Sequence, residues 1–445
     1  MQVSTDHSCD LRLLPPGPHG LVSARPEPDL AAAGYAATEY VAGGTATSYT
    51  APDLPGDGRF AFTPAASAGF VTRVVVRRPV DVAFSGTLVV EWFNVSSGSD
   101  SAPEWTFLAE EVIRRGHAWA GVSAQHAGVE GGVQAVRVAG MEPLGLRREN
   151  PGRYDELHHP GDAFAFDLFT QVGAAVRDLL AAEVVLLVGE SQSAICLTTY
   201  ANGVQPLTGL ADGFLIHSWG AGTAPLGEPV AGLRMEQVLE SHPVVLRDDL
   251  DVPVLVVQTE GDLFDRIGYL PARQSDTDRF RLWEVAGAAH ADSYLIGEFE
   301  EILGSPVPVN RGQQWPVVRA ALHHLDAWAR GTAVPPIAAR LEVAGDGFVL
   351  DEHGLARGGV RTPVVDVPTQ VVCGRPWPDA PLGARLFGST TPLPGVAALH
   401  PSPEAYLEAY AAALDAAVAA GFVLVEDRTA MMDEARPDLI EEPTT

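Results

Sequence analysis

The chain has 445 residues, and 46% of them are hydrophobic, which is enough for one large decorated domain or two domains. Its 57 acidic and 29 basic residues give a net charge of −28, which argues against nucleic acid or an anionic membrane as a partner. Three scattered cysteines, Cys9, Cys196 and Cys373, are too few for a disulfide framework and indicate a reducing compartment. No secretory leader or membrane-spanning run is visible, so we expect a cytoplasmic protein with no membrane partner.

Residues 1–70 are rich in Pro, Gly, Ala and Thr and contain alternating segments such as residues 36–49. We therefore expect an N-terminal β-rich extension. Residues 71–78 and 86–94 have the pattern of strands, and the second leads into a polar loop that contains glycine. A helix and another strand follow before a loop-rich segment that ends near His158.

The most informative segment is residues 184–194, with the sequence VVLLVGESQSA. An apolar run ends at Gly189, Ser191 stands between two polar residues, and small residues then begin a helix. This layout is typical of a nucleophile elbow, a tight strand-to-helix turn that presents a serine hydroxyl above the sheet. The usual pattern is G-x-S-x-G, and Ser193 here replaces the last glycine, which makes the motif less specific. Alone, the segment also fits an ordinary buried strand followed by a helix.

Two later segments also place an apolar run before a polar turn. Residues 253–262 end with Glu260 and Asp262, and residues 281–290 end with small residues and His290. Serine, carboxylate and histidine, each after a predicted strand, follow one another in the order of an α/β-hydrolase. The carboxyl ends of parallel strands share one edge of a sheet, where distant residues meet. In such a triad, histidine takes the serine proton and the carboxylate orients the imidazole.

Two carboxylates compete for the role of triad acid, and the chain is expected to turn between them at Gly261. Asp262 matches the common Gly-x-x-Asp pattern if Thr259 takes the place of the glycine. We therefore predict Asp262 as the acid, with Glu260 as the second choice and Asp265 as a remote third.

Backbone N–H groups are expected to bind the oxyanion of the reaction. In this architecture one donor follows the nucleophile and another lies in the loop after an earlier strand. These positions are Gln192 and either Asn94 or Val95. An ordinary strand-to-helix connection would have a similar sequence, so the choice of donor stays open.

Other residues near these motifs are candidates for the substrate pocket. Glu190 beside the nucleophile is unusual, because an inward carboxylate would disfavour an oxyanion. It could act as an acid or base, but we expect it to face solvent. Trp92 is a second pocket candidate. Apolar side chains after the strand near residue 213 could line an acyl or ring pocket or simply form core: Trp219, Leu226, Met235 and Leu239.

The rest of the pattern completes the expected organisation. Residues 220–251 are expected to form a lid, and Ser402 is expected to cap a helix that begins at Pro403. We predict a core at residues 71–331 and a mixed α+β extension at residues 332–445 that packs on it. The expected fold class is α/β, an α/β-hydrolase fold with a mostly parallel sheet and helices on both faces. His158 and His159 have no partners at ligand spacing, so we expect neither a metal nor a cofactor.

Four segments carry a resemblance to a known family. They are VEWFNVS at residues 90–96, HPGD at 159–162, GESQS at 189–193, and GGVRTP at 358–363 with DVP at 366–368. The chain resembles the bacterial α/β-hydrolase domain-containing family with a long C-terminal extension. This resemblance spans most of the chain and implies an α/β-hydrolase fold and a Ser-acid-His triad. It implies no substrate.

The leading hypothesis is a serine hydrolase that acts on a carboxylic ester or lactone of an uncharged, fairly apolar small molecule. Ser191, His290 and Asp262 would form its triad. A second hypothesis is a non-hydrolytic cyclisation or carbon–carbon bond formation on a polyketide-like biosynthetic intermediate, with His290 as a general base. A third is a catalytically idle binding protein, against which the complete Ser, Asp and His set argues. The oligomeric state is open.

Overall fold

A computed structural model describes residues 9–17, 20–135, 142–227, 238, 241–303, 305–381 and 384–440. The chain forms two compact units. The first unit comprises Met1–Val254 with Pro271–Arg273, and the second comprises Leu255–Leu270 with Gln274–Thr445. This division by packing differs from the boundaries near residues 70 and 331, which remain predictions about domains.

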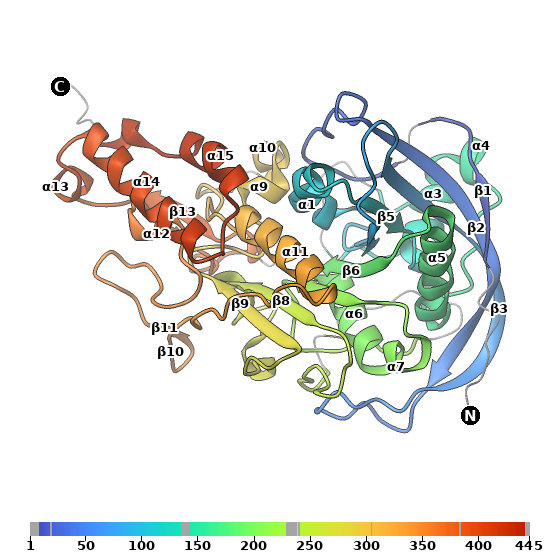
Figure 1. The fold of residues 1–445 in the computed structure, drawn as a ribbon. Coiled ribbons are helices and arrows are strands. Elements are labelled where there is room, and N and C mark those ends of the chain that lie inside the picture. The colour runs from blue at the N-terminus through green and yellow to red at the C-terminus, as the bar shows by residue number, and fades with distance from the viewer. Residues whose placement is uncertain are drawn as a thin grey trace. The chain divides into compact units, whose positions relative to one another are not determined.

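The first unit is built on a sheet with the strand order β1-β2-β3-β5-β4-β6-β7 (Figure 1). Its strands are β1 Asp10–Leu13, β2 Tyr35–Thr50, β3 Thr63–Pro79, β4 Thr87–Trp92, β5 Ala118–Val122, β6 Val184–Glu190 and β7 Gly213–His217. The pairs β4–β5, β4–β6 and β6–β7 are parallel, whereas β1–β2, β2–β3 and β3–β5 are antiparallel. The β-rich N-terminal segment therefore continues the parallel sheet as an antiparallel edge.

Helices cover both faces of this sheet, and β4 shows how. Successive side chains of a strand point to opposite faces. Glu91 accepts hydrogen bonds from two backbone N–H groups in the first turn of α1, Pro103–Arg114. Trp92 packs against Phe169 of α5, Ala165–Leu180, with ring centroids 4.6 Å apart. The helices α1 and α5 therefore lie on opposite faces (Figure 1). Because both faces are covered, β4, β5 and β6 are buried along their whole length and have nearly continuous apolar sequences.

The other helices whose bounds the structure describes in the first unit are short, apart from α6. They are α2 His126–Glu130, α3 Gly145–Glu149, α4 Pro151–Tyr154, the 3₁₀ turn η1 Asp162–Phe164, α6 Gln192–Gly203 and α7 Gln205–Thr208. Among its described residues, the segment predicted as loop-rich between residues 125 and 158 thus contains the short helices α2, α3 and α4.

In the second unit, β8 (Val254–Thr259) and β9 (Phe280–Val285) are neighbours in a sheet. The helix α11 (Trp315–Ala329) packs on β9, where the rings of Trp283 and His324 meet edge to face at 5.8 Å. Two small antiparallel sheets pair β10 Val343–Ala344 with β11 Gly347–Phe348 and β12 Gln370–Cys373 with β13 Ser389–Pro392.

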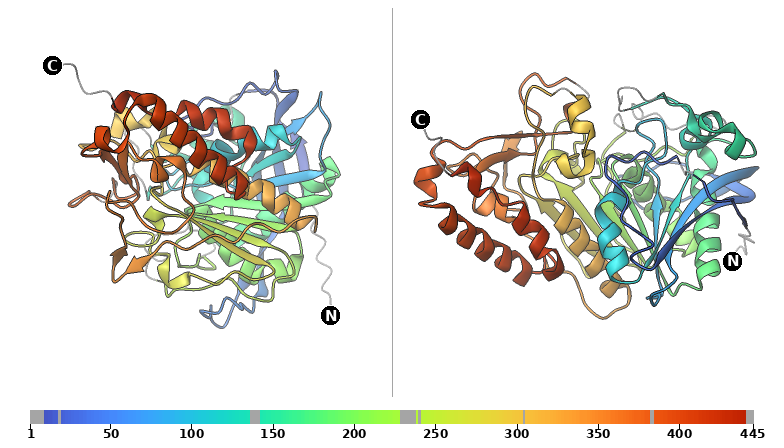
Figure 2. Two further views of the ribbon diagram at one scale, coloured as in Figure 1. Left: turned by 60° about the vertical axis from the view of Figure 1, so that its left-hand side comes forward. Right: turned by 90° about the horizontal axis from the view of Figure 1, so that it is seen from above.

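The other helices of the second unit are α9 Ser293–Ile296, α10 Phe299–Leu303, α12 Pro363–Asp366, α13 Val396–Leu399, α14 Pro403–Ala419 and α15 Arg428–Asp433, with 3₁₀ turns η2 Glu260–Asp262, η5 Val425–Asp427 and η6 Pro437–Leu439. The longest of them, α14, lies beside α15 (Figure 2). The predicted cap is confirmed, because the Ser402 side chain accepts a hydrogen bond from the Ala405 N–H.

The C-terminal region packs directly on the strand that precedes His290. The Val360 N–H donates to the Glu284 carbonyl at 2.6 Å, and the Ala286 N–H donates to the Val360 carbonyl at 3.0 Å. Val360 therefore pairs with the end of β9 through these two backbone hydrogen bonds. The region after residue 332 shares its core with β8, β9 and α11 in this unit.

Candidate active site

The first unit places Ser191 at a sharp turn between β6 and α6. Ser191 has φ 59° and ψ −116°, a backbone conformation that non-glycine residues rarely adopt and that is common at functional turns. Glu190 and Gln192 on either side are each only 3% exposed, whereas Ser191 is partly exposed. The turn thus presents one side chain and buries its two neighbours.

The structure explains why small residues surround the turn. A Cβ atom on Gly189 would lie 2.9 Å from Cδ1 of Leu197 and 3.2 Å from the Ser193 carbonyl carbon, so a side chain there would crowd the start of α6. The Ser193 hydroxyl donates to the Glu190 carbonyl at 2.8 Å and accepts from the Glu190 N–H at 3.1 Å. The serine that replaces the usual glycine therefore closes the turn by itself. The Ser191 N–H donates to the carbonyl of His217 in β7 at 3.0 Å.

The structure distinguishes the candidate oxyanion donors by their present partners. The Asn94 N–H donates to the Ser101 carbonyl at 3.0 Å, which engages it within its own loop. The Val95 N–H donates to Oε1 of Gln192 at 3.3 Å, so it faces the first residue of α6. The Gln192 N–H belongs to the first turn of α6, where backbone donors have no acceptor within the helix. Val95 and Gln192 are thus brought together in one unit.

Glu190 does not face solvent, so that expectation is wrong. It is the last residue of the buried strand β6 and is 3% exposed. The Asn94 side-chain amide donates to the Glu190 carbonyl at 3.1 Å and to its Oε2 at 3.4 Å. Glu190 therefore connects the end of β6 to the loop that follows β4.

The aromatic pocket candidates are both fully buried. The Trp92 indole N–H donates to Oε1 of Gln125 at 3.1 Å, and the Trp219 indole N–H donates to the Gly222 carbonyl at 3.0 Å. Their roles in a pocket remain predictions. Within the expected lid, residues 228–237, 239 and 240 lie outside the described residues, and these include Met235 and Leu239.

The second unit brings Asp262 and His290 together. Oδ1 of Asp262 lies 2.6 Å from Nδ1 of His290, and both side chains are buried. The other carboxylate oxygen, Oδ2, accepts from the N–H and the hydroxyl of Thr259 at 2.6 and 2.8 Å. Because both oxygens of Asp262 have partners, the carboxylate is fixed in orientation, and it can hold the histidine in one tautomer.

Glu260 has different partners, although it lies only two residues from Asp262. Its Oε2 accepts from the Gly287 N–H at 2.8 Å, and its Oε1 accepts from the Gly374 N–H at 3.0 Å. Burial raises the pKa of Glu260 above its usual value, although these two N–H groups act in the opposite direction. Glu260 thus fastens the segment before His290 to the end of β12.

Two amide side chains that the sequence did not single out also hold the histidine loop, residues 286–291. Asn310 accepts from the Ala289 N–H at 3.0 Å and donates to the Gly287 and Cys373 carbonyls at 2.8 and 3.1 Å. Gln314 donates to the Ala289 carbonyl at 3.1 Å. The sequence contains no signal for these contacts, because the partners lie more than 20 residues away along the chain.

The second of the paired histidines, His159, has backbone partners. His159 contacts the Ala124 carbonyl through Nε2 at 2.9 Å and accepts from the Gly161 N–H through Nδ1 at 3.1 Å. Across the part of the chain that the structure describes, no group of three or more His, Cys, Asp or Glu side chains is arranged to hold a metal ion. The same residues include no helix that is both long and apolar enough to cross a bilayer.

Comparisons with solved structures return proteins of low similarity. A lidless serine hydrolase from Xanthomonas campestris is 13% identical, with 58% of this chain and 91% of that chain covered and a TM-score of 0.31. Est1E from Butyrivibrio proteoclasticus is 11% identical, with 58% and 96% covered and a TM-score of 0.32. Acetyl xylan esterase 1 from Thermoanaerobacterium sp. is 12% identical, with 63% and 82% covered and a TM-score of 0.30. These low scores carry no argument about activity.

Comparison with curated protein sequences returns no match to this chain. A model of the α/β-hydrolase domain family, in contrast, matches residues 11–433, which is nearly the whole chain. The predicted α/β-hydrolase fold is therefore confirmed, and the match includes the serine turn, the Asp262–His290 pair and most of the C-terminal region. The chain belongs to the α/β-hydrolase domain family.

Proposed function

We propose that this protein is a serine hydrolase that cleaves a carboxylic ester or lactone. The observation that carries the proposal is the Ser191 turn, where a non-glycine residue is held at positive φ and partly exposed between two buried neighbours. Strain of this kind costs free energy and persists only where the surrounding contacts enforce it. A serine presented in this way at the end of a parallel strand is suited to nucleophilic attack.

The proposed mechanism uses Ser191 as the nucleophile, His290 as the base and Asp262 as the acid that orients His290. The Ser191 hydroxyl attacks the carbonyl carbon while Nε2 of His290 takes its proton. Collapse of the tetrahedral intermediate expels the alcohol, which takes the proton from His290, and leaves an acyl group on Ser191. Water then hydrolyses this acyl-enzyme, with His290 again as the base. Asp262 holds the Nδ1 side of His290 throughout, which the 2.6 Å contact between them supports.

The proposed oxyanion hole consists of the Val95 and Gln192 N–H groups. In the structure, Val95 donates to the side-chain oxygen of Gln192 at 3.3 Å. A substrate carbonyl would replace this amide oxygen as the acceptor of the Val95 N–H. Donors that are fixed before the reaction stabilise the developing negative charge without reorganisation. The Asn94 N–H is not included, because it already donates to Ser101.

The proposed substrate is an uncharged and fairly apolar small molecule. The net charge of −28 would repel anionic substrates over long range. The chain also has only 29 basic residues that could pair with an anionic group. This proposal leaves the length of the acyl chain open.

Turnover of p-nitrophenyl esters and simple lactones tests the proposal. We expect wild-type protein to hydrolyse at least one of them, and Ser191→Ala to lose this activity while its thermal unfolding stays close to wild type. The loss should be at least about 10³-fold, because residual acceleration then comes only from binding and the oxyanion hole. Equal turnover by both proteins would contradict the assignment of Ser191.

A second function is favoured by one observation, the buried carboxylate of Glu190 beside the nucleophile. An additional acid or base at this position fits a cyclisation or carbon–carbon bond formation, in which His290 acts as a general base and the N–H groups bind an enolate. Ester turnover that depends on Ser191 would exclude it as the main activity. Absence of both turnover and fluorophosphonate labelling would instead favour this function or a binding role.

A further inference from the structure

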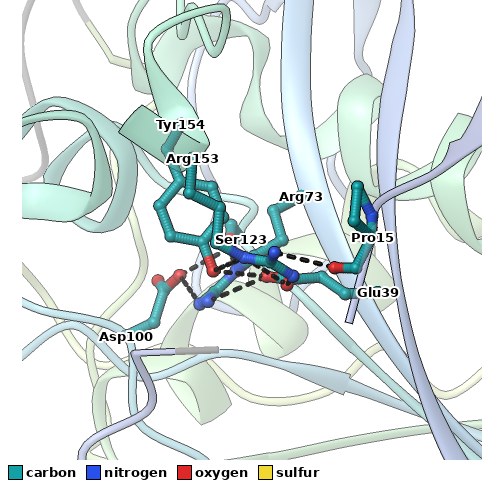
Figure 3. Close-up of polar contacts among 7 residues, drawn as sticks. All are labelled: Pro15, Glu39, Arg73, Asp100, Ser123, Arg153 and Tyr154. Carbon is teal, nitrogen blue, oxygen red and sulfur yellow. Dashed lines mark hydrogen bonds and ion pairs between the residues drawn. The ribbon is translucent and has the colours of Figure 1, made fainter. Parts of the chain in front are cut away.

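A buried cluster of charged side chains lies outside the proposed triad and centres on Arg73 of β3 (Figure 3). Arg73 is fully buried, and its guanidinium contacts several side chains. It donates through Nε to the Ser123 hydroxyl at 3.1 Å, through Nη1 to Glu39 at 3.4 Å, and through Nη2 to Asp100 at 2.6 Å. One arginine therefore joins β2, the end of β5 and the loop that follows β4.

Other groups balance the charge of this cluster. Arg153 and Tyr154 of α4 both contact Glu39, the latter through its hydroxyl at 2.7 Å, and Arg153 also donates to the Pro15 carbonyl at 2.8 Å (Figure 3). With Arg73 and Asp100, the cluster contains two arginines and two carboxylates. Its formal charge is zero, which reduces the cost of burying it.

Asp100 connects this cluster to the proposed oxyanion hole. It belongs to the loop of residues 94–101, which contains Val95. Oδ2 of Asp100 accepts from Arg73 and also from the Ser123 hydroxyl, the latter at 2.5 Å. The Asp100 carbonyl accepts from the Val22 N–H at 2.9 Å. The next residue, Ser101, exchanges two backbone hydrogen bonds with Asn94 at 3.0 and 2.9 Å. The contacts of Asp100 therefore fix the end of the loop where Asn94 and Ser101 pair. Val95 is the residue that follows Asn94 along the chain.

Asp100 is buried and tightly packed against α2. A Cβ atom on Gly128 of α2 would lie 1.9 Å from Oδ1 of Asp100, so only glycine fits beside this carboxylate. Oδ1 is buried, and no hydrogen-bond partner for it is found among the residues that the structure describes. A buried carboxylate oxygen without a donor costs free energy. Since buried ion pairs add little net stability, a positional role accounts better for this arrangement.

We propose that Arg73 and Asp100 are positioning residues that hold the 94–101 loop so that the Val95 N–H is directed at the oxyanion. The proposal rests on the proposed function of Val95. In this proposal, neither Arg73 nor Asp100 contacts a reacting atom. Their effect passes through the Asn94–Ser101 backbone pair, and it should therefore change the rate of the chemical step more than the binding of substrate.

The test compares Asp100→Asn with Glu39→Gln. Each variant removes one carboxylate charge from the contacts of Arg73, but only Asp100 belongs to the 94–101 loop. Two readouts are used: hydrogen–deuterium exchange of peptides that cover residues 94–101, and kcat and KM for the best ester substrate. The exchange measurement does not depend on activity, so it decides the positional claim even if the hydrolase assignment fails.

We expect Asp100→Asn to raise exchange in the 94–101 loop by about tenfold or more. Its kcat should fall by about 10- to 100-fold, less than the loss of a whole oxyanion donor, with KM nearly unchanged. Glu39→Gln should leave loop exchange and kcat close to wild type. Wild-type exchange and kcat in Asp100→Asn, or equal losses in Glu39→Gln, would overturn the proposal.

A milder variant keeps the test decisive if Asp100→Asn does not fold. Ser123→Ala removes the hydroxyl that donates to Asp100 and accepts from Nε of Arg73, and it changes no charge. We expect it to raise loop exchange and lower kcat in the same direction by a smaller factor. Unchanged loop exchange in Ser123→Ala would count against the positional role.

Discussion

The serine turn and the histidine loop are held in place in different ways. In the serine turn, Ser193 makes both of its hydrogen bonds to Glu190, three residues away, and Gly189 provides the space for α6. In the histidine loop, Asn310 and Glu260 contact backbone groups that lie 21 to 114 residues away. The serine turn is thus specified by a short local sequence, whereas the position of the histidine loop depends on residues far away along the chain.

The neighbouring carboxylates Glu260 and Asp262 show the same contrast within three residues. Both are buried, but Asp262 contacts His290 and Thr259, whereas Glu260 accepts N–H groups from Gly287 and Gly374. One carboxylate orients the proposed catalytic histidine, and the other holds the backbone around it.

The largest expected effect separates these two carboxylates. Asp262→Asn should lower kcat by about 10³- to 10⁴-fold, because an amide at this position favours the wrong tautomer of His290. Glu260→Gln should lower kcat by no more than about tenfold and reduce stability by about 1–3 kcal/mol, since one of its two N–H partners then loses its acceptor. Ester kinetics and thermal unfolding of both variants provide the measurement. A larger rate loss in Glu260→Gln would assign the acid to Glu260 instead.

A smaller effect should distinguish the histidine loop, which is held by residues far away along the chain, from the serine turn, which is held by its neighbours. Asn310→Ala should reduce the free energy of unfolding by about 3 kcal/mol, because it leaves several buried backbone groups without partners. Ser193→Ala should cost about 1–2 kcal/mol, because the Glu190 carbonyl keeps its hydrogen bond from Asn94. Chemical denaturation of the two variants tests this order. Equal losses would show that the serine turn also depends on long-range support.

The smallest expected effect is a change in how stability depends on pH. The pKa of Glu260 is raised by burial above its usual 4.5. The folded state therefore binds this proton more tightly than the unfolded state. The resulting stability is present below pH 4.5 and is lost as pH rises through the folded pKa. Glu260→Gln should remove this dependence, which amounts to at most about 1.4 kcal/mol per pH unit. If the unfolding free energies of wild type and Glu260→Gln changed with pH in the same way, this prediction would be contradicted.

These contrasts also explain how much the sequence alone could predict. The Ser191 turn and the α/β order of strands and helices were predictable, because apolar runs, Gly189 and the small residues of the turn are local signals. The buried position of Glu190 was not, because it depends on contact with Asn94, 96 residues away. The choice between the Asn94 and Val95 N–H groups likewise depends on Ser101 and Gln192 as hydrogen-bond partners.

The Arg73 cluster shows the same limit. An arginine within the predicted strand at residues 71–78 looks like a surface residue in the sequence, yet it is fully buried. Its partners Glu39 and Asp100 lie 34 and 27 residues away on separate elements. The sequence shows the three residues, but it does not show that their side chains are in contact.

The central claim is that Ser191 is a nucleophile activated by His290, and covalent labelling tests it most directly. Wild-type protein, Ser191→Ala and His290→Gln are each treated with a fluorophosphonate, and the labelled peptide is identified by mass spectrometry. The account predicts a label on Ser191 in wild type, none in Ser191→Ala, and labelling slowed by at least about 10²-fold in His290→Gln, since general-base assistance is lost. A label on another residue, or undiminished labelling of Ser191 in His290→Gln, would contradict it.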